Sequence, residues 1–273
     1  MDEGEGYMKK ITSVVLLIVL LLSVCTPAFA ATGYSGMISE VLDDLESNNS
    51  RCSGAPQQAA NGAYRLVDML AIIAMEGDSG TYSNVISDVL DDLKSNNARC
   101  SGAPQQTVNG IYRCVELLAV IALEKDTFGL YGDLVSDVLD DLSSNNARCS
   151  GAPQQAANGL YRCVDMLAII ASELDRTGSY SDVIGDVLDD LKANNARCSG
   201  APQQQVNGAY RMVELLAIIA MESDTKGTYS KLISDILDDL SSKNAKCSGA
   251  PQQLVNGLYR CVEMAAIVAM ENT

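Results

Sequence analysis

Cysteines and paired aspartates are the side chains of this sequence best suited to chemistry, because the chain contains no histidine. Histidine-dependent catalytic triads and histidine metal sites are therefore excluded. The sequence also has no glycine-rich phosphate loop between a strand and a helix. We expect no enzymatic activity and no cofactor, with weak calcium binding as the one exception considered.

The cysteines that follow residue 30 recur at two positions. Five lie in the segment RCSGAPQQ or its variant KCSGAPQQ, and three lie fourteen residues further along the chain. If the chain bends between the two positions, a disulfide within each unit becomes geometrically easy. This favoured pairing joins Cys100–Cys114, Cys149–Cys163 and Cys247–Cys261. Free or mixed thiols are the second possibility. Pairing with the next unit is the third and would join Cys52–Cys114, Cys100–Cys163 and Cys198–Cys261.

An Asp-Asp pair also recurs, with another acidic residue three positions before it. This spacing places the carboxylates on one face of a helix, where they form an acidic stripe. A solvated face is the favoured interpretation, ahead of ion pairs with the Arg51-type and Arg65-type residues. Weak binding of Ca²⁺ by oxygen ligands is the third interpretation. It would involve Asp91, Asp92, Asp140, Asp141, Asp189 and Asp190.

A third recurring group is polar and lies just after the RCSGAPQQ segment. In the first copy it comprises Gln57, Gln58, Asn61, Tyr64 and Arg65. One interpretation is that these side chains and their equivalents form a ligand face. The favoured one is structural: they satisfy loop carbonyls and neighbouring helices.

These groups recur because the chain is an internal repeat. Tyr34, Tyr82, Tyr131, Tyr180 and Tyr229 mark units of about 49 residues. The predicted units are 33–80, 81–129, 130–178, 179–227 and 228–273. They fill the chain after the leader, which leaves no room for a separate catalytic domain.

Each unit contains two helical patterns. In the second unit, the apolar residues between Tyr82 and Leu93 have the spacing of one helix face, and Asn96-Asn97 can end that helix. Pro104 suits the start of a second helix, which is apolar nearly all round from Ile111 to Leu123 and so predicted to be buried.

The dipeptide Asn-Gly interrupts this second pattern in every unit, as at Asn61-Gly62. Either the helix runs through it and the glycine lets a neighbour approach closely, or a short helix ends there. We slightly favour the break, because glycine costs about 1 kcal/mol inside a helix.

One unit of this size cannot bury its apolar faces alone, but stacked units form a continuous core. The predicted fold is all-α: a right-handed helical-repeat solenoid of five units, each with two long helices and room for one short helix. Residues 31–273 form a single domain.

Residues 1–30 have the features of a secretory signal peptide, with Lys9-Lys10, an apolar stretch from Ile11 to Val24, and Ala28-Phe29-Ala30 for cleavage. Met8 is a candidate initiator. We expect a secreted, periplasmic or cell-surface protein, with no transmembrane segment after cleavage. The net charge of −16 opposes binding to nucleic acid.

The sequence therefore predicts an exported, non-catalytic binding or structural module at the cell surface or in the extracellular space. Its partner would be a protein, a surface polymer or another copy of the chain. The alternative is an acidic surface or matrix component that responds to divalent cations and self-assembles.

Overall fold

The computed structural model describes residues 34–126 and 129–272, and in these residues all regular secondary structure is helical. The predicted signal peptide, residues 1–30, lies outside the described residues. The prediction of an all-α fold is confirmed.

Long and short helices alternate along the chain. The long ones each span 23 residues and begin at the Ala-Pro of the RCSGAPQQ segment, where proline fits the first helical turn. They are α3 (Ala55–Gly77), α5 (Ala103–Lys125), α7 (Ala152–Leu174), α9 (Ala201–Ser223) and α11 (Ala250–Asn272). The shorter ones are α2 (Ser35–Asn49), α4 (Ser83–Asn97), α6 (Gly132–Asn146), α8 (Ser181–Arg197) and α10 (Ser230–Asn244).

The long helices form the inside of the molecule. Each packs on the next along the chain, and α11 packs on α3. Nearly every residue in the second half of a long helix is buried, whereas a short helix such as α4 buries only Ile86, Val89 and Leu93. The long helices therefore make an inner ring, and the short helices lie outside it.

The contact between α11 and α3 closes the ring. In addition, α2 packs against both α3 and α11, so the first helix bridges the two ends of the repeat array. A solenoid is open, with two terminal units that lack one neighbour. The helix packing is consistent with a helical repeat, but the predicted right-handed solenoid is not confirmed.

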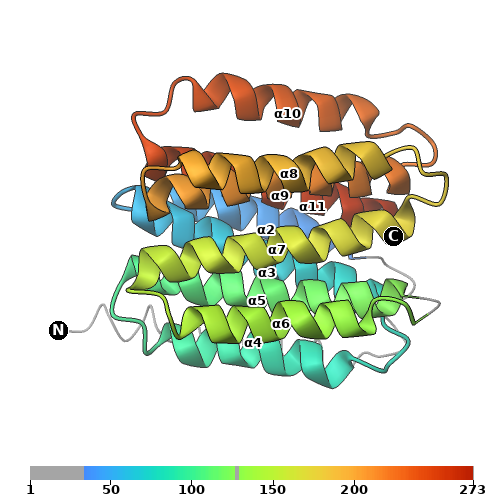
Figure 1. Cartoon of the computed structure of the whole chain (residues 1–273), viewed down its shortest axis with the longest axis horizontal. Coiled ribbons are helices and arrows are strands. Elements are labelled where there is room, and N and C mark those ends of the chain that lie inside the picture. The colour runs from blue at the N-terminus through green and yellow to red at the C-terminus, as the bar shows by residue number, and fades with distance from the viewer. Residues whose placement is uncertain (1–33, 127–128, 273) are drawn as a thin grey trace.

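The two ends of this ring differ in sequence. At one end, the RCSGAPQQ segments, here called the joints, connect each outer helix to the following inner helix. At the opposite end, the loop end, segments such as 78–82 lead from an inner helix to the next outer one. The helices run side by side between the two ends (Figure 1).

The slightly favoured break at Asn-Gly was wrong, because all five long helices run through that dipeptide. The alternative, close approach, is what the structure shows. A Cβ atom on Gly110 would lie 2.8 Å from Cδ1 of Tyr64 and 2.9 Å from Cβ of Ala63. The glycine is needed because the preceding inner helix presses its tyrosine ring against this point.

Candidate functional site

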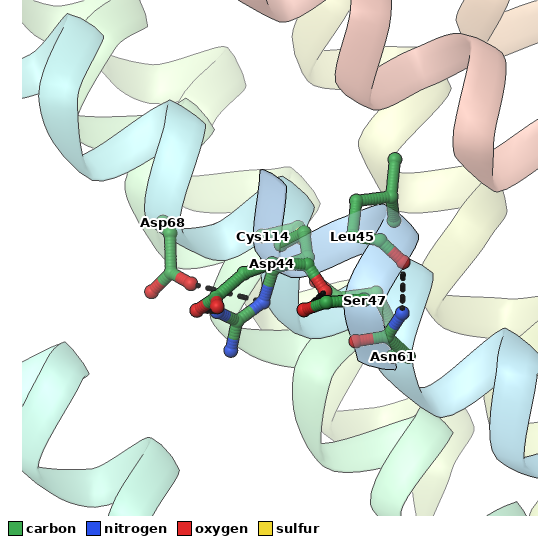
Figure 2. Close-up of polar contacts among 8 residues, drawn as sticks. Asp44, Leu45, Ser47, Asn61, Asp68 and Cys114 are labelled. Carbon is green, nitrogen blue, oxygen red and sulfur yellow. Dashed lines mark hydrogen bonds and ion pairs between the residues drawn. The ribbon is translucent and has the colours of Figure 1, made fainter. Parts of the chain in front are cut away.

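The asparagine of each Asn-Gly dipeptide ties the inner helix to its outer helix. Asn61 Nδ2 donates to the Leu45 carbonyl at 3.1 Å, and Figure 2 shows this amide pointing at that oxygen. The same bond recurs in the other units, where it spans 3.0–3.2 Å. The bond fixes the last turns of the outer helix to the inner helix, because a carbonyl oxygen can accept a second hydrogen bond besides the one within its helix.

The tyrosine of the polar group joins neighbouring units. Tyr64 Oη donates to Asn97 Oδ1 at the end of the next outer helix, at 2.8 Å. The last copy, Tyr259, donates to Asn49 at 2.9 Å, across 210 positions of sequence. Burial raises the pKa of Tyr64 to about 12, so the phenol remains a donor at physiological pH. The same interaction therefore joins successive units and closes the ring.

The arginine of the group lies between acidic side chains of two helices. Arg65 contacts Asp44 of α2 at 2.8 Å and Asp68 of α3 at 3.3 Å, and Figure 2 shows these two carboxylates. Equivalent pairs occur at Arg113, Arg162, Arg211 and Arg260. The second aspartate of each Asp-Asp pair is thus ion-paired with an Arg65-type residue, which was the second interpretation.

No three acidic or cysteine side chains of the described residues gather as a metal site. The three pairs proposed for calcium lie on outer helices: Asp91-Asp92, Asp140-Asp141 and Asp189-Asp190. The second aspartate of each pair, such as Asp92, contacts an arginine of the following inner helix. The structure therefore gives no geometric support to the weak calcium site.

The predicted disulfides are absent, since all eight cysteines of the described residues are free thiols. The favoured pairing of Cys100–Cys114, Cys149–Cys163 and Cys247–Cys261 needed a bend at Asn-Gly, and the continuous helix removes it. Cys114 is instead buried with its Sγ 3.8 Å from the Ala63 carbonyl, and Cys100 Sγ donates to the Asn96 carbonyl at 3.3 Å. The next-unit pairing is likewise absent.

A pocket of about 280 Å³ lies at the joint between α4 and α5 and reaches the start of α7. Its lining includes four of the five polar positions predicted as a ligand face, here as Gln105, Asn109, Tyr112 and Arg113. Asn109, Tyr112 and Arg113 make the structural bonds just described, in line with the favoured structural interpretation. Gln105 uses its side-chain oxygen to accept from the Ser101 amide at 2.9 Å, which leaves its amide nitrogen as a donor.

The lining also contains Gln155, the third-unit equivalent of the predicted Gln58, and Arg99, which was not predicted as a ligand residue. Gln155 belongs to the following unit, so only the packing of α5 on α7 brings it to the pocket. The sequence placed Arg99 in a joint between helices and not in a ligand site, although a basic residue recurs at this position in every joint.

A second cavity, of about 160 Å³, lies among the inner helices near their C-terminal ends. Its wall is mostly leucine and isoleucine, residues predicted only to be core. One feature of the sequence could have indicated this cavity: the fifth unit differs from the other four at two of the wall positions.

The fold and these pockets define a closed, all-α repeat protein with two kinds of cavity. Searches found no family model, no curated protein and no solved structure that matches the chain.

One described helix, α5, is long and apolar enough to cross a membrane by length and composition alone. The sequence predicted no transmembrane segment after the leader. In the structure α5 is a core helix, packed between α3 and α7.

Proposed function

We propose that this protein is an exported, non-catalytic binding module whose joint end holds an anionic surface polysaccharide. The observation that supports this proposal most strongly is the pocket of about 280 Å³ on the predicted ligand face. Export rests on the signal-like residues 1–30, and a ligand of the cell surface or extracellular space follows from export.

The joint end differs in charge from the rest of this acidic chain. Each joint segment is taken from the last turn of the outer helix to the glutamines of the following inner helix. In the five segments together, Glu46 is the single acidic residue. The basic residues in the same segments are Arg51, Lys94, Arg99, Arg148, Arg197, Lys243 and Lys246. A local excess of positive charge attracts an anionic ligand even when the net charge of the protein is negative.

The pocket chemistry fits a polar ligand. Arg99 supplies a guanidinium that recognises a carboxylate, and Gln105 and Gln155 supply amides suited to hydroxyl groups. The same residue types recur at the other joints, with Lys246 in place of arginine in the last. A polymer that contacts several joints gains affinity from multivalency, which a small ligand would not.

Binding of polygalacturonate, a polymer of uronic acids, tests this proposal by calorimetry. We expect binding that weakens at least tenfold between 50 and 300 mM salt, because exposed charges are screened. Arg99→Ala combined with Arg148→Ala should weaken it, whereas Lys226→Ala at the loop end should not. Equal binding of neutral dextran, or no effect of the arginine variant, would contradict the proposal.

Self-assembly is the second candidate function, and the charge difference between the two ends favours it. Acidic residues predominate at the loop end, where Glu76, Asp78, Glu124, Asp126, Glu173, Asp175, Glu222, Asp224 and Glu271 outnumber Lys125, Arg176 and Lys226. Opposite charges would let rings stack joint end to loop end. Sedimentation at low ionic strength should then show oligomers that dissociate in salt, and a monomer at every ionic strength would exclude stacking.

A further inference from the structure

The cavity inside the ring is a second potential binding site, separate from the joints. All five inner helices contribute to its wall. The apolar lining residues are Leu70, Ile73, Leu118, Ile121, Leu167, Ile170, Leu174, Leu216, Ile219 and Val268. Lys125, Glu222, Ser223 and Thr225 also line it, and they belong to the loop end.

The cavity can be traced to the fifth unit. Four units place a leucine at one lining position, Leu70, Leu118, Leu167 and Leu216, and the fifth has Ala265 there. Four units place an isoleucine at the next lining position, Ile73, Ile121, Ile170 and Ile219, and the fifth has Val268. The fifth unit therefore presents four fewer side-chain carbon atoms to the middle of the ring.

The ring cannot easily collapse to fill this space. Each inner helix is held against its neighbour by a tyrosine ring on a glycine, and α11 is held on both sides: Tyr259 lies against Gly62, and Tyr210 lies against Gly257. Voids larger than a water molecule are few in natural protein interiors, because a void forfeits contacts between atoms. A retained cavity with mainly leucine and isoleucine walls is therefore a candidate site for a ligand.

The chemistry of the wall selects the ligand. An apolar cavity of about 150 Å³ stays dry and takes up benzene or xenon. The polar side chains of the wall lie at the loop end, so most of the wall offers water no partner. At that end Glu222, Glu76 and Glu124 outnumber Lys125, which disfavours an anion. We propose that the cavity binds a small uncharged apolar molecule, about the size of a benzene ring, which enters from the loop end.

Fluorobenzene tests this inference on the full chain. We expect fluorine NMR to show saturable binding and the melting temperature to rise with fluorobenzene concentration, because a ligand that binds only the folded state stabilises it. No saturable binding would overturn the inference.

The matched variant gives the fifth unit the side chains of the other four. Ala265→Leu with Val268→Ile should fill the cavity and weaken fluorobenzene binding at least tenfold, with an unchanged or higher melting temperature. Val268→Ile alone adds one methyl group and should weaken binding less, which keeps the test decisive if the double variant does not fold. Unchanged affinity in the variants that fold would contradict the inference.

Two controls separate this site from others. Leu232→Ala removes a side chain that is 44 % exposed on α10, and binding should survive it if the probe is not held at the surface. Polygalacturonate binding should be unaffected by the filling variants, so failure of either proposal leaves the other standing.

Discussion

At the scale of single residues, the Asn-Gly dipeptide is the most informative feature of the chain. Its asparagine holds an outer helix by a carbonyl, and its glycine receives the tyrosine ring of the preceding unit. Two adjacent residues therefore specify two different packing contacts. The intrinsic cost of glycine in a helix is offset by the close approach of two inner helices that it permits.

The first prediction compares two glycines within helices. A Cβ at Gly110 would lie under 3.0 Å from Tyr64 and Ala63, whereas one at Gly185 of α8 meets no atom within 4 Å. Gly110→Ala should destabilise the fold by about 1–3 kcal/mol through overpacking. Gly185→Ala should stabilise it by about 0.5–1 kcal/mol through helix propensity.

Urea unfolding followed by circular dichroism measures both effects. Gly185→Ala serves as the control, because both variants make the same chemical change inside a helix. A stabilising Gly110→Ala would show that the tyrosine ring moves aside at little cost.

At the scale of elements, the ends of the inner helices carry carboxylates in an unfavourable setting. Burial raises the pKa of Glu76 to about 7, against the effect of Lys125. Burial, with Asp78 nearby, raises the pKa of Glu124 to about 7 as well. The buried Oε1 atoms of Glu76 and Glu124 have no hydrogen-bond partner among the described residues.

These raised values predict how stability depends on pH. Between the ordinary pKa of 4.5 and about 7, the folded state binds more protons at these carboxylates than the unfolded state does. Their contribution to the free energy of unfolding therefore falls as pH rises through this window. Glu76→Gln with Glu124→Gln should remove much of that fall.

The urea midpoint at pH 5, 6, 7 and 8 checks this prediction. The variant should gain stability over the natural chain mainly at pH 7 and 8, by on the order of 1 kcal/mol after solvent screening. Glu40→Gln on α2 controls for the loss of a negative charge. The same gain at every pH would disprove titration as the cause.

At the scale of the whole molecule, ring closure distinguishes this fold from an open repeat array. The packing of α11 on α3 and the bond from Tyr259 to Asn49 give the last unit a neighbour on both sides. The apolar faces that an open array leaves at its two ends are therefore covered, without capping units of different sequence.

Closure predicts that the chain tolerates circular permutation. Joining Asn272 to Tyr34 through a copy of residues 78–81 would reproduce the natural connection between α3 and α4. New termini between Thr177 and Gly178 would lie in the connection before α8. The permuted chain should melt cooperatively within about 5 °C of the unpermuted residues 34–272, because all helix contacts are retained.

Calorimetry of the two chains makes the comparison. The control has the same cut but no linker, so it consists of two separate fragments. These fragments should assemble when they are mixed, and their melting temperature should depend on concentration. A permuted chain that fails to fold would argue against the closed ring.

The sequence by itself determined the helices, their order and the amphipathic character of the outer set. These properties depend on residues within a few positions of one another, such as the spacing from Tyr82 to Leu93 or the position of Pro104. The sequence also indicated most of the polar pocket at the joint between α4 and α5, because Gln105, Asn109, Tyr112 and Arg113 fall on successive turns of one helix.

Only the tertiary structure decided the closed ring, the continuous inner helices, the free thiols and the cavity. Each depends on a contact between residues far apart in the chain: Tyr259 with Asn49, Tyr64 with Gly110, and Val268 facing the leucines and isoleucines of four other helices. Local propensity counted against the glycine, and packing against the neighbouring unit outweighed it. The sequence did not show which arrangement the units adopt. The units are nearly identical, and the same residues would suit an open stack or a closed ring.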